Sequence, residues 1–112
     1  MIVQEQFQIE RGGTSSRVAY AGDVATGSAG TIYTGISSRV FELRFMRVTN
    51  TNASARTVTI EAAGKNFAQV SVAANSHEDL LTVPVVFDVS EDITALASGS
   101  DVDIHFWGYQ LG

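Results

Sequence analysis

The sequence predicts an all-β fold: a single β-sandwich of about eight short strands, with an immunoglobulin-like or a jelly-roll arrangement. Two observations support this. Apolar and polar residues alternate through most of the chain, and turn-forming residues separate the alternating runs at short intervals. Helical periodicity is absent. The 112 residues suffice for one domain with a modest two-layer core.

The clearest element is a β-hairpin over residues 41–64. Phe41, Leu43 and Phe45 alternate with Glu42 and Arg44. A cluster of Thr, Asn, Ala and Ser follows, and the alternation then resumes over residues 57–62. A period of two places one set of side chains in the core and leaves the other set facing water or a partner.

Other strands are expected on both sides of this hairpin. Within the long strand over residues 39–49, the apolar phase slips near Phe45 and Met46, which predicts a β-bulge there. Pro84 has no backbone N–H, so an edge strand or a bulge is expected around it. The remaining strands are predicted at residues 2–9, 31–34, 67–72, 81–89, 93–97 and 102–109.

The chain divides into an N-terminal part and a sandwich. Residues 1–30 are predicted to form a first strand followed by a loop-rich arm, because residues 12–38 are rich in Gly, Ser, Thr and Ala. We expect this part to contribute more to assembly than to the fold. Residues 31–112 are predicted to form the β-sandwich domain.

The alternation also predicts which side chains lie between the two sheets. These are the apolar residues at the inward positions of the long strands. The predicted layer consists of Phe41, Leu43, Phe45, Val58, Ile60, Val83, Val85, Ile104 and Phe106.

Charge is distributed unevenly along the chain. All seven basic residues lie at or before position 65 together with five acidic ones, a net charge of +2, whereas the rest has seven acidic residues and a net charge of −7. Intramolecular pairing with a solvated acidic rim would explain this distribution. A subunit whose basic side meets the acidic side of a neighbour would explain it too. The second interpretation makes Arg39, Arg44, Arg47 and Arg56 candidate interface residues.

Three aromatic residues close the chain. Phe106, Trp107 and Tyr109 place rings on both faces of the last strand. Phe106 is expected in the core. Trp107 and Tyr109 could form a sugar-stacking platform or a subunit contact, and the contact is favoured because Trp and Tyr combine apolar area with a polar tip.

Residues with catalytic or metal-binding chemistry are few. Asp101, Asp103 and His105 are spaced by two and share one strand face, where they could bind a divalent cation. The solvent face of an edge strand is the favoured interpretation, so no metal, cofactor or catalytic residue is assigned. The chain has no cysteine and no motif of a known enzyme class. It is therefore predicted not to be an enzyme.

Composition also limits the partners and the location. The acidic second half would repel phosphates, so nucleic acid is not expected as a partner. The N-terminal residues lack the pattern of a signal peptide, and no apolar run approaches the roughly 18 residues of a transmembrane helix. We therefore expect no membrane partner.

Four segments carry a resemblance to a known group: IYTG, RVFELRFMRVTNTNASARTVTIE, VAANSHEDLL and SEDITALASGSDVDIHFWGY. In this order they resemble the small β-sandwich virion proteins of tailed bacteriophages. That group has a Tyr-Thr turn before a strand ending in V-T-N-T, a small-residue hairpin tip, and a D-x-I-x-A strand followed by D-V-x-I. The resemblance covers residues 31–112.

The resemblance implies a non-enzymatic structural protein of a phage virion, made in the host cytoplasm. A capsid decoration or cement protein is expected first. It would bind the major capsid protein or other virion proteins and its own copies as a homo-oligomer. A tail, neck or fibre-adaptor protein is the first alternative. A carbohydrate-binding β-sandwich module that recognises a host-surface glycan is the second.

Overall fold

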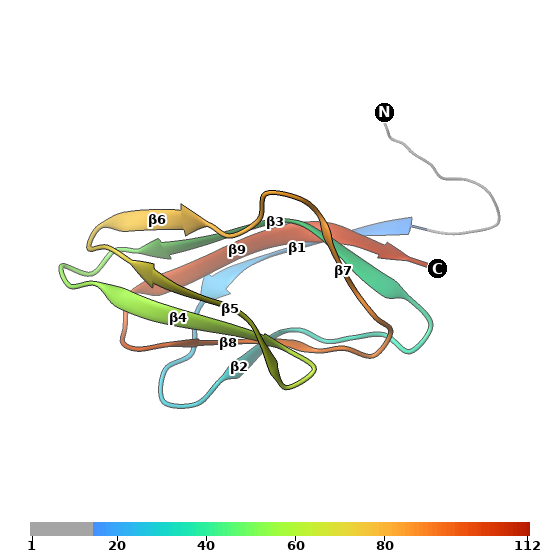
Figure 1. Ribbon diagram of the computed structural model, residues 1–112, viewed down its shortest axis with the longest axis horizontal. Coiled ribbons are helices and arrows are strands. Elements are labelled where there is room, and N and C mark those ends of the chain that lie inside the picture. The colour runs from blue at the N-terminus through green and yellow to red at the C-terminus, as the bar shows by residue number, and fades with distance from the viewer. Residues whose placement is uncertain (1–14) are drawn as a thin grey trace.

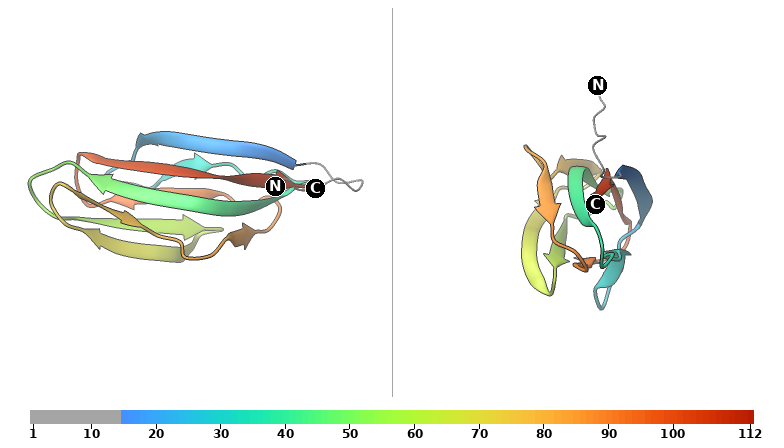
Figure 2. Two further views of the ribbon diagram at one scale, coloured as in Figure 1. Left: turned by 90° about the horizontal axis from the view of Figure 1, so that it is seen from above. Right: turned by 90° about the vertical axis from the view of Figure 1, so that its right-hand side faces the viewer.

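The computed structural model describes residues 15–112 and confirms the all-β prediction. Within these residues the chain forms nine strands and no helix, arranged as two antiparallel sheets packed face to face (Figure 1). Figure 2 shows the two layers from above and along their length. The strand predicted at residues 2–9 lies outside the described residues.

The first sheet, sheet A, contains the longest strands. Its order is β1 (Ser15–Asp23), β9 (Val102–Leu111), β3 (Val40–Asn50) and β6 (Ser76–Asp79), and β7 (Val85–Phe87) also pairs with β3. β9 therefore lies between β1 and β3 and is hydrogen-bonded on both edges. The last strand of the chain is therefore a central strand of sheet A.

The second sheet, sheet B, is shorter. Its order is β2 (Gly30–Tyr33), β8 (Ile93–Ala97), β4 (Arg56–Ala62) and β5 (Lys65–Val72). The predicted hairpin over residues 41–64 is wrong, because β3 and β4 lie in different sheets and do not pair. β4 instead forms a hairpin with β5, whose turn holds Ala63 and Gly64 at φ of 52° and 77°. These left-handed conformations suit a tight two-residue hairpin turn.

The strand order decides between the two predicted sandwich types. Orders β1-β9-β3-β6 and β2-β8-β4-β5 place the first strand beside the last, and most connections cross from one sheet to the other. An immunoglobulin-like sandwich instead places its first and second strands in the same sheet. The protein is thus a jelly roll, built from two four-stranded sheets, with β7 as an extra short strand.

The core fills the space between the sheets. Six of the residues predicted there are buried: Phe41, Leu43, Val58, Ile60, Ile104 and Phe106. Rings meet at its centre, where Phe41 stacks on Tyr33 with ring centroids 4.2 Å apart and contacts Phe106 edge-on at 6.1 Å. The fully buried Phe106 also stacks on Tyr20 at 5.5 Å. Such ring pairs stabilise a core beyond the area that they bury.

Phe45 was wrongly placed in this layer. The register of β3 against β9 shifts between Leu43 and Phe45, so the predicted bulge exists but falls at Arg44, before Phe45. Phe45 therefore turns outward and Met46 enters the core. Gly108 lies beside this bulge, and a Cβ there would overlap the carbonyl oxygen of Glu42.

Val83 and Val85 were also wrongly placed as core residues. Val83 is 63% exposed, and Val85 is only half-buried, packed against the edge of the core. Of the strand predicted over residues 81–89, only β7 (Val85–Phe87) forms. Pro84 has no N–H to donate, and the chain bends just before it.

The segment predicted as a loop-rich arm differs as well. Ser15–Asp23 forms β1, which pairs with β9 along its whole length. Val18 and Tyr20 pack against the core, and Val24 is buried. The small residues did not prevent a strand, since β9 pairs with every residue of β1 along one of its edges. The assignment of residues 1–30 to an assembly role stays a prediction.

Candidate interaction surface

The outer face of sheet A, which points away from the core, is the candidate functional surface. Pairing fixes which side chains it presents: residues that alternate with the buried Ile104 and Phe106 on β9, and their neighbours on β1 and β3. We call this surface the A face. It consists of Arg17, Ala19, Ala21, Asp23, Glu42, Arg44, Phe45, Arg47, Thr49, Asp103, His105, Trp107 and Tyr109.

One end of the A face combines arginines with aromatic rings. The guanidinium of Arg17 lies over the ring of Trp107, 5.1 Å from its centroid, and that of Arg44 lies 5.4 Å from the centroid of Tyr109. The two rings meet edge-on at 6.0 Å. Arg44 also forms a salt bridge to Glu42, with 3.1 Å between Nη2 and Oε1. Trp, Tyr and Arg are the residue types enriched at the centres of protein interfaces.

The middle of the A face is held by an ion pair and two ring contacts. Arg47 donates from Nε to Oδ1 of Asp79 at 2.6 Å and from Nη2 to Oδ2 at 3.1 Å, which ties β3 to β6. These hydrogen bonds lower the pKa of the Asp79 carboxyl and raise the pKa of the Arg47 guanidinium. The Arg47 guanidinium also lies 5.6 Å from the centroid of the Phe45 ring. Phe45 in turn meets the ring of His105 edge-on at 5.6 Å.

The other end of the A face is acidic. Asp23 on β1 lies directly opposite Asp103 on β9. A side-chain hydrogen bond to Asp23 raises the pKa of Asp103, and partial burial and the charges of Asp23 and Asp101 raise it further. Like charges directly opposite each other on neighbouring strands are destabilising. A cationic group that reached this pair would relieve the repulsion.

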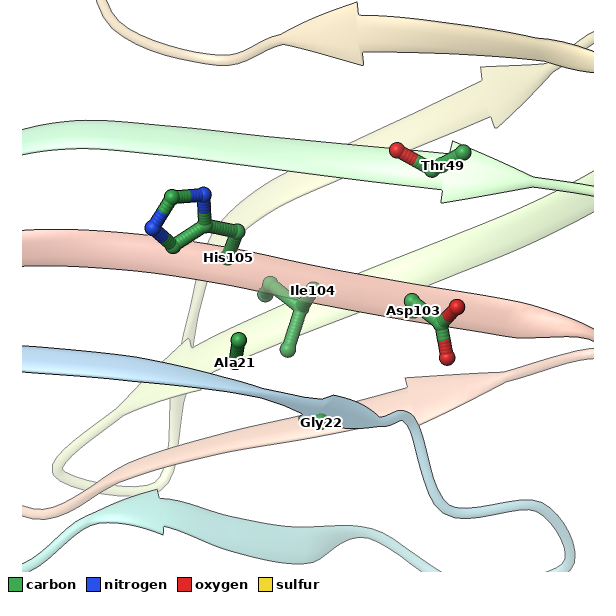
Figure 3. Close-up of a pocket in the computed structure, with 6 residues that line it drawn as sticks. All are labelled: Ala21, Gly22, Thr49, Asp103, Ile104 and His105. Atoms are coloured by element: carbon green, nitrogen blue, oxygen red, sulfur yellow. The ribbon is translucent and has the colours of Figure 1, made fainter.

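A shallow depression lies beside the acidic pair. It has a volume of about 350 Å³ and is lined by residues from three neighbouring strands, shown in Figure 3. Ala21 and Gly22 belong to β1, Thr49 to β3, and Asp103, Ile104 and His105 to β9. The depression forms here because Ala21 and Gly22 have little or no side chain to fill the surface of the sheet.

The predicted interface residues are only partly brought together. Arg44, Arg47, Trp107 and Tyr109 lie on the A face. Arg39 lies at the end of the sheet, where Nη1 donates to the Ser16 hydroxyl at 3.1 Å. Arg56 lies on β4 of sheet B, and its Nε donates to the carbonyl of Ser100 at 3.0 Å. Their role in contacts between subunits stays a prediction.

Sequence reasoning missed Arg17 and Asp23, the A-face charges on β1. Both lie in the segment that was interpreted as a loop-rich arm. The signal was present, because Arg17, Ala19, Ala21 and Asp23 alternate with the inward-facing Val18, Tyr20 and Gly22. The small residues within the run concealed this period of two.

The metal-binding and glycan-binding alternatives involve residues on or beside the A face. Among residues 15–112, no three or more His, Asp or Glu side chains gather as metal ligands would. Asp103 and His105 share the A face, whereas Asp101 precedes β9 and accepts a hydrogen bond from the Asn52 amide at 2.8 Å. A glycan that stacked on Trp107 would compete with Arg17 for the ring. The described part of the chain has no helix that is long and apolar enough to cross a membrane.

The comparisons with known proteins show a likeness in fold alone. No family model matches the chain, and no similar protein was found among curated sequences. A solved structure described as "Bacillus endospore appendages form a novel family of disulfide-linked pili" matches with a TM-score of 0.57 and 14% identity. The match covers 99% of this chain and 96% of the other. The chain thus shares its β fold with a small bacterial appendage protein.

Proposed function

We propose that this protein is a non-enzymatic structural subunit that assembles with copies of itself into a particle or fibre. The A face supports this best, because it gathers Trp107, Tyr109 and two arginines on one exposed sheet. These are the residue types that dominate binding energy at protein interfaces. The likeness to an appendage protein over nearly the whole of both chains agrees with a structural role.

The setting that we propose first is the virion of a tailed bacteriophage, where the protein would decorate the capsid. Support comes from the four sequence segments that resemble small virion proteins. They correspond to β2, the successive strands β3 and β4, the β5–β6 connection, and the successive strands β8 and β9. A decoration protein would bind the major capsid protein through one surface and its own copies through another.

A fibre or appendage subunit is the second candidate. The structural match to a pilus protein favours it. Copies of this chain could not be joined in the way named for that structure, because the sequence contains no cysteine for a disulfide. A fibre of this protein would therefore depend on noncovalent contacts.

Self-association is tested by sedimentation of the purified chain over a wide concentration range. We expect a concentration-dependent rise in mass above that of the monomer. A chain that stays monomeric at all concentrations would contradict the proposal. Electron microscopy of the assembled material, alone and with phage capsids that lack decoration proteins, separates the two settings: binding to capsids supports decoration, and filaments formed by the chain alone support a fibre.

A further inference from the structure

The two ends of the A face carry charges of opposite sign, and Arg17 at one end and Asp23 and Asp103 at the other form no salt bridge within the described chain. Among residues 15–112, salt bridges occupy only Arg44 with Glu42 and Arg47 with Asp79. Arg17 lies over a ring instead of beside a carboxylate. Asp23 and Asp103 face each other, and neither belongs to one of these salt bridges.

These charges are symmetrically placed. On β1, Arg17 and Asp23 lie three residues on either side of Tyr20, and on β9, Tyr109 and Asp103 lie three residues on either side of Phe106. Tyr20 and Phe106 are themselves directly paired. Arg17 and Asp23 point to the same face and are separated by about 20 Å, since each strand residue adds about 3.3 Å.

A two-fold axis at the level of Tyr20 and Phe106 would use this symmetry. Consider an axis that lies between two A faces and runs perpendicular to the strands. Rotation about it places β1 of one copy over β1 of the other, and β9 over β9, with each pair of strands running in opposite directions. Arg17 of each copy then faces Asp23 of the other, and Tyr109 faces Asp103. Because a two-fold axis repeats every contact, the pair of Arg17 with the partner's Asp23 forms once at each end of the dimer.

Shape agrees with the same arrangement. Trp107 lies one residue beyond Phe106 towards the arginine end, and His105 lies one residue towards the acidic end. The axis therefore places Trp107 of one copy above His105 and Ala21 of the other. This is the position of the depression of about 350 Å³, which is open enough to receive an aromatic side chain (Figure 3).

We propose that two copies of this chain pack A face to A face, antiparallel, with Arg17 paired to Asp23 of the partner and Trp107 seated in the partner's depression. The inference deepens the proposed function, on which it rests, by naming the surface and the orientation of one contact. Charge complementarity sets the orientation, because a parallel arrangement would bring the acidic ends together.

Two charge reversals test the orientation. Arg17→Glu alone would set a second carboxylate against Asp23 at both ends of the dimer, and Asp23→Arg alone would set a second guanidinium against Arg17. We expect each variant to dimerise at least about tenfold more weakly than the wild type. An equimolar mixture of the two should recover association as a heterodimer, because every pair then has opposite signs. Lys65→Glu, at the β4–β5 turn of sheet B, is the matched control and should dimerise normally.

Trp107 provides a second readout because it is the only tryptophan. Its emission should shift to shorter wavelength as the wild-type chain associates, and it should stay unshifted in Arg17→Glu at the same concentrations. Thermal unfolding of each variant controls for the fold.

The outcomes separate the two proposals. A chain that never associates overturns both. Association that ignores both reversals, that is not recovered in the mixture, or that leaves Trp107 emission unchanged overturns the A-face dimer. Each of these three results leaves self-association through another surface intact.

Discussion

The side-chain amide of Asn50, on β3 of sheet A, donates a hydrogen bond to the carbonyl of Val72, on β5 of sheet B, at 3.2 Å. The same amide nitrogen lies 2.8 Å from the carbonyl oxygen of Ser54 and 3.2 Å from that of Ala73. Its oxygen accepts from the backbone N–H of Asn52 at 2.9 Å. Asn50 is the buried polar residue of the described core, and it joins the two sheets where β3 ends.

Replacing Asn50 should destabilise the fold. Asn50→Leu has a similar volume but leaves these backbone groups without their partner, so we expect a loss of about 1–3 kcal/mol in the free energy of unfolding. Asn50→Asp should cost more, because a carboxylate would face carbonyl oxygens that can only accept. Urea denaturation measures both, with the exposed Asn66→Ala as control. A change in Asn50→Leu no larger than the control's would contradict this role.

Phe106 tests the assigned face of the last strand. It is fully buried between Tyr20 and Phe41, so Phe106→Ala should lower the free energy of unfolding by about 3–5 kcal/mol. Val83→Ala removes apolar atoms from a side chain that is 63% exposed and should change it by less than about 0.5 kcal/mol. Equal losses in the two variants would mean that the faces were assigned wrongly.

The sequence predicted the parts of the fold that depend on local alternation. The strands β3, β4 and β9 and the inward faces of β4 and β9 follow from a period of two in strands that bury one face. The predicted pairing of β3 with β4 in a hairpin is wrong, because the two strands belong to different sheets. The choice of a jelly roll could not be predicted in this way. It depends on which strands become neighbours, such as β1 and β9, and these are far apart in the sequence.

The candidate surface could be predicted only in part, because local sequence patterns do not show which distant strands pair. Trp107 and Tyr109 indicate an interface by residue type, wherever their strand lies. The importance of Arg17 and Asp23 depends on the pairing of β1 with β9, which brings Arg17 to Trp107 and Asp23 to Asp103. Local patterns do not contain this information, and the short, small residues of β1 are typical of loops as well as strands.

Asp103 should make stability depend on pH in the direction opposite to a paired carboxylate. Its pKa is raised in the folded chain by Asp23, so the folded state binds this proton more tightly than the unfolded state. This contribution to stability is complete below the ordinary Asp pKa and is lost as the pH rises through the raised value. Asp103→Asn should therefore be more stable than the wild type at neutral pH.

The measurement is the midpoint of thermal unfolding of the two proteins across acidic to neutral pH. The advantage of Asp103→Asn should shrink as the pH falls, because the wild-type proton is then bound. Glu78→Gln, an exposed carboxyl on β6, is the control and should not show this trend. An advantage that is equal at all pH values would indicate that repulsion from Asp23 is not its cause.

Two deletions distinguish the contribution of β1 from that of the residues before it. Removal of residues 1–14 keeps every described strand, so this chain should unfold cooperatively at a temperature near that of the wild type. Removal of residues 1–30 takes away β1, its core-facing Val18 and Tyr20, and the buried Val24. It also exposes one edge of β9, which is long and would offer unpaired backbone groups to other chains. We expect this second chain to aggregate or to lack a cooperative transition in circular dichroism. A cooperatively folded, monomeric chain of residues 31–112 would instead show that β1 is dispensable for the sandwich, as the predicted division at residue 30 requires.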